Sequence, residues 1–326
     1  MFKYLLAAIL LPSLLFISCQ KKASDFQDTN TLQDGIVALL QKLSIQINKT
    51  GSAQARNTTP RQASFQLLSF AIAKAGLANE LNDPKFAYTL FAPTDEAFAA
   101  LGLGTRQAIN TMPVDKLKAI LLYHVLGSKV MATQVPETYT ELTMLSNQAA
   151  YIIRRGATVT INGSSVVAAD IAAKNGIIHA IDRVLMPPAG NIVEVAAANP
   201  NFSYLVAAVQ RAGLVDALAG AGPLTVFAPT NQAFIDAGFP TIASIEAATP
   251  SALIPILTYH VAAGRVFSSD LVNGQMLTML SGGMTTVLLN NGAQIDGASS
   301  ASSNIIQTDV VATNGVIHVI DRVLLP

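Results

Sequence analysis

The stretch TLFAPTDEAF at residues 89–98 returns 136 residues later as TVFAPTNQAF at residues 225–234. Two further blocks return in the same order: YHV at 123–125 and 259–261, and NGIIHAIDRVL at 175–185, which becomes NGVIHVIDRVL at 314–324. A period of this length is well above the roughly 20 to 50 residues of solenoid or propeller repeats and matches the size of a self-sufficient domain. The chain of 326 residues therefore contains a duplicated domain rather than a short structural repeat.

The repeated stretch has the chemistry of a strand that ends and a helix that begins. Pro93 has no N–H for a strand ladder, and the hydroxyl of Thr94 or Thr230 can accept a hydrogen bond from the first free N–H groups of the next helix. Asp95 and Glu96 fall in the first turn, where the helix dipole favours negative charge. A catalytic acid and base pair is the weaker interpretation, because the second repeat has uncharged amides at both positions.

The closing block of each repeat predicts a strand in the middle of a sheet. Along residues 177–185 apolar side chains occur on both alternating faces, which is typical of a strand covered on both sides. The alternation also places Asp182 and Arg183 on opposite faces, so each needs its own partner, and the same holds for Asp321 and Arg322. We favour a buried aspartate held by backbone donors, and half of a partner-binding patch is the alternative.

Helical spacing of apolar residues predicts matched helices over residues 65–77 and 202–214. Gly76 and Gly213 stand where these helices should stop. In the later helix that precedes the second YHV block, Pro255 removes a backbone hydrogen bond. That helix should therefore be kinked, or begin later than its counterpart.

An amphipathic helix is also expected at residues 32–47. The segment from Lys49 to Gln62 is rich in Thr, Asn, Ser and Arg, and it separates this helix from Phe65. We interpret it as a surface loop inserted into the first domain. The alternative assigns residues 32–47 to a tether outside the domain.

All four histidines fall in matched positions, which makes them candidates for a metal or catalytic site: His124, His179, His260 and His318. A metal site needs three or four converging ligands, but no His-x-x-x-His pair, second cysteine or carboxylate cluster accompanies them. A nucleophile held by a base is not indicated either, because no Gly-x-Ser-x-Gly elbow occurs. We expect no metal, no cofactor and no catalytic residue. At the ends of their helices, His124 and His260 can instead hydrogen-bond and interact favourably with the helix C-terminus.

Together the FAPT[DN]xAF, Tyr-His and NGxIHxIDxVL blocks resemble the motifs of the fasciclin (FAS1) family, in both repeats. The resemblance implies an α+β fold with two tandem fasciclin-like domains, each a β-sandwich wedge flanked by helices. Short β-rich runs separated by Gly, Asn and Ser are compatible with that fold. We expect the first domain at residues 32–187 and the second at 190–326.

For function, the resemblance implies extracellular adhesion or surface binding, with a cell-surface or extracellular protein or polysaccharide as the partner. The motif positions that could contribute to a partner surface are Tyr123, His124, Asp182, Arg183, Tyr259, His260, Asp321 and Arg322. A sugar site through Tyr139 or Tyr151 is conceivable but not indicated. The alternative function is a structural spacer or accessory component of a surface complex, without its own ligand. An enzyme is a third class, which the motifs do not favour.

The composition fits a chain with two packed cores. Hydrophobic residues make up 51% of the chain and charged residues only 12%, with 20 basic residues balancing 20 acidic ones. Such a chain is too apolar for disorder. Since no basic run is present, nucleic acid is not an expected partner.

Residues 1–18 predict a lipoprotein signal peptide. Lys3 gives a positive start, residues 4–15 form an apolar run, and FISC at 16–19 resembles a bacterial lipobox, which would make Cys19 the lipidated first residue. The apolar run is too short for a permanent membrane-spanning helix. Residues 19–31 are interpreted as a polar tether, and the expected location is the outer membrane, facing the periplasm or the cell surface. An ordinary secretory signal with a coincidental cysteine is the alternative.

Partner specificity is expected where the repeats differ, because strand, turn and core demands explain the matched blocks. The largest differences are the polar insert at 49–62 and residues 290–303, whose Asn, Gly and Ser residues we expect to form an exposed, adaptable loop. The alternative is that both segments are tolerated insertions without a role.

Replacing the only cysteine tests the anchor. The Cys19→Ser protein should leave the membrane fraction, because the chain then has no thiol to carry lipid and loses the membrane affinity of the acyl chains. Cell fractionation and mass spectrometry of the mature N-terminus measure this. An unmodified Cys19 in the wild-type protein, or a variant that stays in the membrane, would contradict the anchor.

Overall fold

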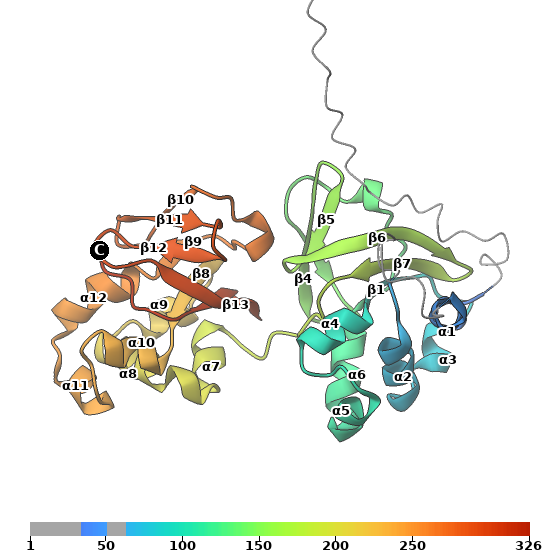
Figure 1. The fold of residues 1–326 in the computed structure, drawn as a ribbon, viewed down its shortest axis with the longest axis horizontal. Coiled ribbons are helices and arrows are strands. Elements are labelled where there is room, and N and C mark those ends of the chain that lie inside the picture. The colour runs from blue at the N-terminus through green and yellow to red at the C-terminus, as the bar shows by residue number, and fades with distance from the viewer. Residues whose placement is uncertain (1–33, 51–62) are drawn as a thin grey trace, which may run out of the picture.

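The computed structural model describes residues 34–50 and 63–326. These residues form two tandem α+β domains, each with a seven-stranded sheet and a set of helices (Figure 1). The fold class expected from the sequence is confirmed. The predicted signal peptide, Cys19, the tether and residues 51–62 of the polar insert lie outside the described residues.

The first domain begins with helices interrupted by strand β1 and ends with a series of strands. Its helices are α1 Ile36–Thr50, α2 Gln66–Lys74, α3 Ala78–Leu81, α4 Asp95–Ala100, α5 Arg106–Thr111 and α6 Val114–Leu122. Its strands are β1 Tyr88–Pro93, β2 Val125–Leu126, β3 Thr140–Thr143, β4 Ala149–Arg155, β5 Thr158–Ile161, β6 Ser164–Ala173 and β7 Gly176–Ile181, with the short helix η3 Ala132–Gln134 between β2 and β3.

The second domain repeats this order. Its helices are α7 Ile192–Ala197, η4 Pro200–Phe202, α8 Ser203–Arg211, α9 Val215–Ala219, α10 Asn231–Asp236, α11 Ile242–Ala247, α12 Pro250–Thr258 and η5 Ser268–Asp270. Its strands are β8 Leu224–Pro229, β9 Val261–Ala263, β10 Met276–Thr278, β11 Met284–Leu288, β12 Gln294–Asp296, β13 Ser303–Ala312 and β14 Gly315–Ile320.

Each sheet is built around a parallel pair of strands. In the first domain β1 runs parallel to β7, with Tyr88 opposite Gly176 and Pro93 opposite Ile181. The closing strand β7 also pairs antiparallel with β6, so it lies inside the sheet, in the order β2-β1-β7-β6-β5-β4-β3. The central position predicted for the closing strand is confirmed, and β14 repeats it beside β8 and β13.

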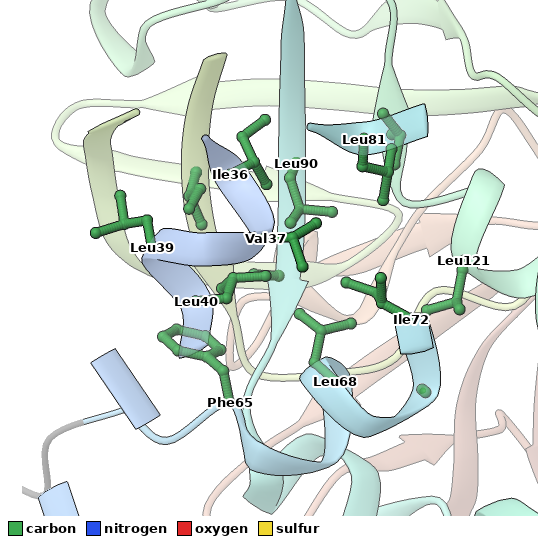
Figure 2. Close-up of a cluster of buried hydrophobic side chains, with 14 of the residues drawn as sticks. Ile36, Val37, Leu39, Leu40, Phe65, Leu68, Ile72, Leu81, Leu90 and Leu121 are labelled. Carbon is green, nitrogen blue, oxygen red and sulfur yellow. The ribbon is translucent and has the colours of Figure 1, made fainter. Parts of the chain in front are cut away.

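The two faces of this strand pair close two separate cores. Leu90 faces the helices (Figure 2), and Ile178 belongs with it to the larger core. Phe91 and Ile181 face the other way and pack with Ile152 of β4. The far end of the sheet therefore folds over its own centre, which produces a wedge with helices on one side.

Helix α1 packs into the first core. Ile36 and Leu40 are buried there (Figure 2). The Asn175 side chain, from the turn before β7, accepts a hydrogen bond from the Ile36 N–H at 3.0 Å. In the second domain Asn314 accepts from the Ile192 N–H of α7 at 2.9 Å. The first residue of α1 thus makes the same hydrogen bond to an asparagine as the first residue of α7. This match favours the interpretation that α1 belongs to the first domain rather than to the tether.

The threonine after each Ala-Pro pair caps a helix, as predicted. The Thr94 hydroxyl accepts a hydrogen bond from the Ala97 N–H at 3.2 Å, and the Thr230 hydroxyl accepts from the Ala233 N–H at 3.3 Å. These bonds satisfy one of the free donors at the start of α4 and α10.

Asp95 does more than the sequence suggested. Its carboxylate lies in the first turn of α4 but also reaches the start of α2, where it accepts from the Leu67 N–H at 2.8 Å. Asn231 makes the equivalent bond to the Tyr204 N–H at 3.1 Å. Because a side-chain amide oxygen accepts as well as a carboxylate, the two repeats can differ here without losing the contact.

The structure contradicts the later helix start and the single exposed loop expected in the second domain, while a kink at Pro255 stays a prediction. Helix α12 starts at Pro250, the position that matches Val114 of α6, so Pro255 does not delay it. The carbonyl that Pro255 leaves free belongs to Ser251, in an exposed first turn where water can replace the missing donor. Residues 290–303 are not one exposed loop, because they contain β12 and its buried Ile295.

The glycine that opens each closing strand is required by close approach. A Cβ on Gly176 would lie 2.4 Å from the Tyr88 carbonyl oxygen and 2.5 Å from Ile36 Cδ1, and one on Gly315 would lie 2.2 Å from the Leu224 carbonyl oxygen. Neither glycine is among those with a positive φ. The demand therefore comes from the neighbouring strand and helix rather than from a turn conformation.

Gly176→Ala should lower the unfolding free energy of the first domain by about 1 to 3 kcal/mol, the usual cost of overpacking. Gly127→Ala is the matched control, because a Cβ there meets Leu145 at an ordinary 3.5 Å. Urea unfolding of both variants measures the difference. Equal stability of the two would refute the close-approach explanation.

Candidate functional site at the domain junction

The motif tyrosines are buried and serve the scaffold. Tyr123 donates to the Ala149 carbonyl of β4 at 2.6 Å, and its oxygen accepts from Asn162 at 2.9 Å. Tyr259 donates to the Met284 carbonyl of β11, also at 2.6 Å. Both rings are fully buried. They tie the end of a helix to the folded-over part of the sheet and offer no surface to a partner.

The motif histidines that follow are also buried, and their neighbours fix the tautomer. His124 Nδ1 lies 2.8 Å from the Ile120 carbonyl, which can only accept, while Nε2 lies 2.9 Å from the Leu185 N–H, which can only donate. The proton must therefore sit on Nδ1. His260 repeats the arrangement with Ile256 and Leu324. The helix-end hydrogen bond expected from the sequence is present.

Burial keeps these two imidazoles neutral. Desolvation lowers the pKa of His124 and of His260 to about 4, although the hydrogen bond to the helix carbonyl opposes the shift. A neutral imidazole therefore stabilises the C-terminus of the helix through that hydrogen bond and not through a positive charge. Both ring nitrogens are occupied by backbone groups, so neither can serve as a free base.

His179 and His318 carry the proton on the other nitrogen. His179 Nε2 donates to the Val130 carbonyl at 2.9 Å, and its Nδ1 accepts from the Asp170 N–H at 3.2 Å. His318 makes the same contacts to Val266 and to Asp309, whose N–H lies 3.4 Å from Nδ1. Asp170 and Asp309 interrupt their strands with φ of 60° and 61°. Each histidine thus positions an aspartate that turns out of the sheet.

Asp182 and Arg183 have separate partners, as the alternation predicted, but Asp182 is not buried. Its carboxylate is exposed, and it accepts from the Ser164 hydroxyl and the Ser165 N–H, both at 2.8 Å. Asp321 makes the matching bonds at the start of β13. These aspartates are held by a hydroxyl and a backbone donor, as expected, although at the edge of the solvent.

Arg183 reaches from the first domain into the second. Its Nη1 lies 2.5 Å from Asp309 Oδ2 and 2.9 Å from the Thr308 hydroxyl. The Asp309 side chain is only 5% exposed, whereas that of Arg183 is 46% exposed. A buried carboxylate needs a charge partner or several donors, and the other domain supplies the charge. The matched Arg322 makes no side-chain contact of this kind among the described residues.

A second buried aspartate completes the junction. Asp270 of η5 accepts from the Tyr139 hydroxyl at 2.7 Å and 2.5 Å and pairs with Arg155, and its side chain is 8% exposed. Burial raises the pKa of Tyr139, and its hydrogen bond and charge interaction with Asp270 raise it further. The tyrosine therefore remains a donor to the carboxylate at all physiological pH values.

Apolar contact surrounds these polar bonds. The guanidinium of Arg265 lies 4.0 Å from the centroid of the Tyr151 ring. Phe267 and Val316 of the second domain are fully buried, with Tyr139 and Tyr151 packed against them. The junction therefore combines a cation–π contact, apolar burial and ion pairs between the domains.

Two clefts flank the junction. One has a volume of about 600 Å³ and is lined by residues that include Tyr139, Glu141, Tyr151, Pro223 and Arg265. The other, of about 590 Å³, lies between α4, the linker and β13, and its lining is largely apolar. The two tyrosines considered from the sequence for sugar binding thus share one cleft.

Sequence reasoning found Arg183 but missed its partner Asp309 and the second ion pair, between Asp270 and Arg155. Asp309, Asp270 and Arg155 lie outside the matched blocks, and no local pattern links residues more than a hundred positions apart. A comparison of the repeats gives a usable signal, because Asp270 and Arg155 have no charged counterpart in the other repeat.

The described part of the chain, residues 34–50 and 63–326, has no helix long and apolar enough to cross a membrane. The same residues contain no cluster of three metal-ligating side chains.

The chain resembles known proteins over both domains. The profile of the Fasciclin domain matches residues 63–187 and 200–326. Protein sll1483 of Synechocystis sp. is 43% identical over 136 residues, 41% of this chain and 73% of that protein. Transforming growth factor-beta-induced protein ig-h3 of Sus scrofa is 32% identical over 243 residues, which cover 74% of this chain but only 35% of the relative.

Among solved structures, the FAS1 domain pair from the insect cell adhesion molecule Fasciclin I is 22% identical to this chain. The match covers 80% of this chain and 97% of that one, with a TM-score of 0.39.

Stability should fall in mild acid because of the buried imidazoles. The folded pKa of about 4 lies below the ordinary value of 6.5, so the unfolded chain binds more protons between these values. The stabilisation is complete above pH 6.5 and is lost as the pH falls towards 4, by roughly 2 kcal/mol for each histidine at pH 4.5. Urea unfolding at pH 7 and 4.5, with imidazole titration by NMR, measures this. An imidazole that titrates near 6.5 in the folded protein would contradict it.

Proposed function

Because this chain belongs to the fasciclin domain family, we propose that it is an exported, lipid-anchored bacterial protein that binds an extracellular protein or polysaccharide and acts in adhesion. The resemblance to the fasciclin family implies adhesion or surface binding, which supports a general adhesion or binding role. The anchor on Cys19 rests on the lipobox-like sequence, and the outer membrane or cell surface is its proposed location.

The observation that carries the proposal is that the motif histidines and tyrosines hold the scaffold together. The ring nitrogens of all four histidines bond to backbone groups, and the motif tyrosines are buried in the scaffold. This leaves the surface as the place where such a protein can act, and it argues against an enzyme.

The junction cleft is the binding site that we propose. Tyr139 and Tyr151 supply aromatic surface, and Glu141 is an exposed acceptor. Aromatic rings beside polar groups suit a saccharide or the side chains of a protein. Because both domains line the cleft, binding there depends on the pair rather than on either domain alone.

A structural spacer is the second candidate, and the junction contacts favour it. Two buried aspartates of the second domain take their charge partners from the first, so the pair resists bending between the domains. A stiff unit of this kind can hold another component away from a membrane without a ligand of its own.

An attachment assay distinguishes the two. Bacteria that display the full chain should attach to immobilised collagen, fibronectin or extracted surface polysaccharide several-fold more than bacteria that express the Cys19→Ser protein. Glu141→Lys should reduce attachment, because it replaces the acceptor in the cleft with a cation, whereas Lys118→Glu on the exposed surface of α6 is the matched control. Attachment equal to the Cys19→Ser strain on every surface would reject adhesion and favour the spacer.

A further inference from the structure

Each domain contains a counterpart of both faces that meet at the junction. We call the contacting residues of the first domain the arginine face: Tyr139, Tyr151, Arg155 and Arg183. The contacting residues of the second domain form the aspartate face: Phe267, Ser268, Asp270 and Asp309. Because the domains are duplicates, the second domain also carries a version of the arginine face, and the first a version of the aspartate face.

The aspartate face is preserved in the first domain at its central residue. Asp170 Oδ1 accepts from the Ala132 N–H at 2.8 Å, as Asp309 Oδ1 accepts from the Ser268 N–H at 2.7 Å. Both aspartates have a φ near 60° and both are positioned by a buried histidine. Asp309 has its ion pair with Arg183, whereas Asp170 has none among the described residues.

Of the arginine face, the second domain retains Arg322 in the place of Arg183, whereas Thr286 takes the register position of Tyr151. Met276 lies opposite Thr286, in the place that Glu141 and Tyr151 occupy in the first domain. Arg322 stands where Arg183 stands in the repeated block, and its side chain is exposed. Met276 and Met284 are 58% and 47% exposed, so this version is also apolar.

Burial differs between the covered and the uncovered aspartate face. Phe267 is fully buried beneath the tyrosines of the first domain. Its counterpart Met131 is only half-buried, and Ala172, the counterpart of the buried Val311, is half-buried as well. The first domain therefore presents an open version of a surface that the second domain keeps covered.

The charges of the two open faces are compatible. Arg322 and Asp170 repeat the pair of Arg183 and Asp309. The other ion pair of the junction, between Arg155 and Asp270, is replaced on the open faces by the uncharged Asn290 and Gln134. No like charges are brought together at these positions, and the one ion pair that is preserved gives the contact a direction.

We propose that copies of this chain associate head to tail, with the arginine face of one second domain on the aspartate face of the next first domain. Arg322 of one copy then binds Asp170 of the other, and Met276 and Met284 cover Met131. Because two different faces meet, the contact can repeat and arrange copies in a row or a ring. No linker joins these faces, so association depends on concentration and increases where anchored copies are crowded on one membrane.

Sedimentation equilibrium of the full chain, in a detergent matched in density to the solvent, tests the association. The wild-type protein should form dimers and larger species as its concentration rises. Arg322→Glu places a like charge against Asp170 and should raise the dissociation constant at least tenfold, whereas Lys118→Glu should leave it unchanged. A wild-type protein that stays monomeric at all concentrations, or an Arg322→Glu protein that associates normally, would overturn the proposal.

A mixing experiment tests the direction of the contact. Asp170→Asn keeps the acceptor for the Ala132 N–H and tolerates the positive φ, but removes the charge. Each variant alone should associate weakly, while a mixture of Arg322→Glu and Asp170→Asn proteins retains one intact pair of faces and should stop at dimers. A mixture that associates no better than either variant alone would refute the head-to-tail arrangement. Circular dichroism of both variants checks that they are folded.

Discussion

The parallel pairing of the first and last strands is the contact on which each domain depends. Strands β1 and β7 are separated by more than eighty residues, and the other strands of the first domain continue the sheet on both sides of this pair. Such long-range pairing is entropically costly to form. The cost is offset because both faces of the pair are buried, in one core under the helices and in another under β4 and β5.

The close approach of these strands explains much of the repeated sequence. Gly176 allows β7 to lie against β1 and α1, and the preceding Asn175 holds the start of α1. The buried histidines then secure segments that leave the sheet: His124 binds the chain beyond β7, and His179 binds the turn before η3. Neutral imidazole suits these places because it can donate at one nitrogen and accept at the other.

Local patterns predicted the parts of this fold that local chemistry determines. The alternation along β7, the threonine caps and the helix stops at Gly76 and Gly213 all follow from neighbouring residues, and the structure has them. Contacts across the chain could not be read in this way. The bond from Asp95 to α2, the buried Ile295 within a polar segment and the partners of Arg183 depend on which surfaces meet after folding.

The junction connects the buried scaffold with the surface. His318 is fixed by the Val266 carbonyl and accepts from the Asp309 N–H, and the Asp309 carboxylate holds Arg183 of the other domain. A residue required for the core of one domain therefore also sets the position of its neighbour. The buried contacts of this series occur in both domains, because His179 also donates to the Val130 carbonyl and accepts from the Asp170 N–H. The ion pair at the surface can diverge between the domains, since the first domain folds whether or not an arginine reaches Asp170. A duplicated fold thus retains docking geometry that its own chain does not use.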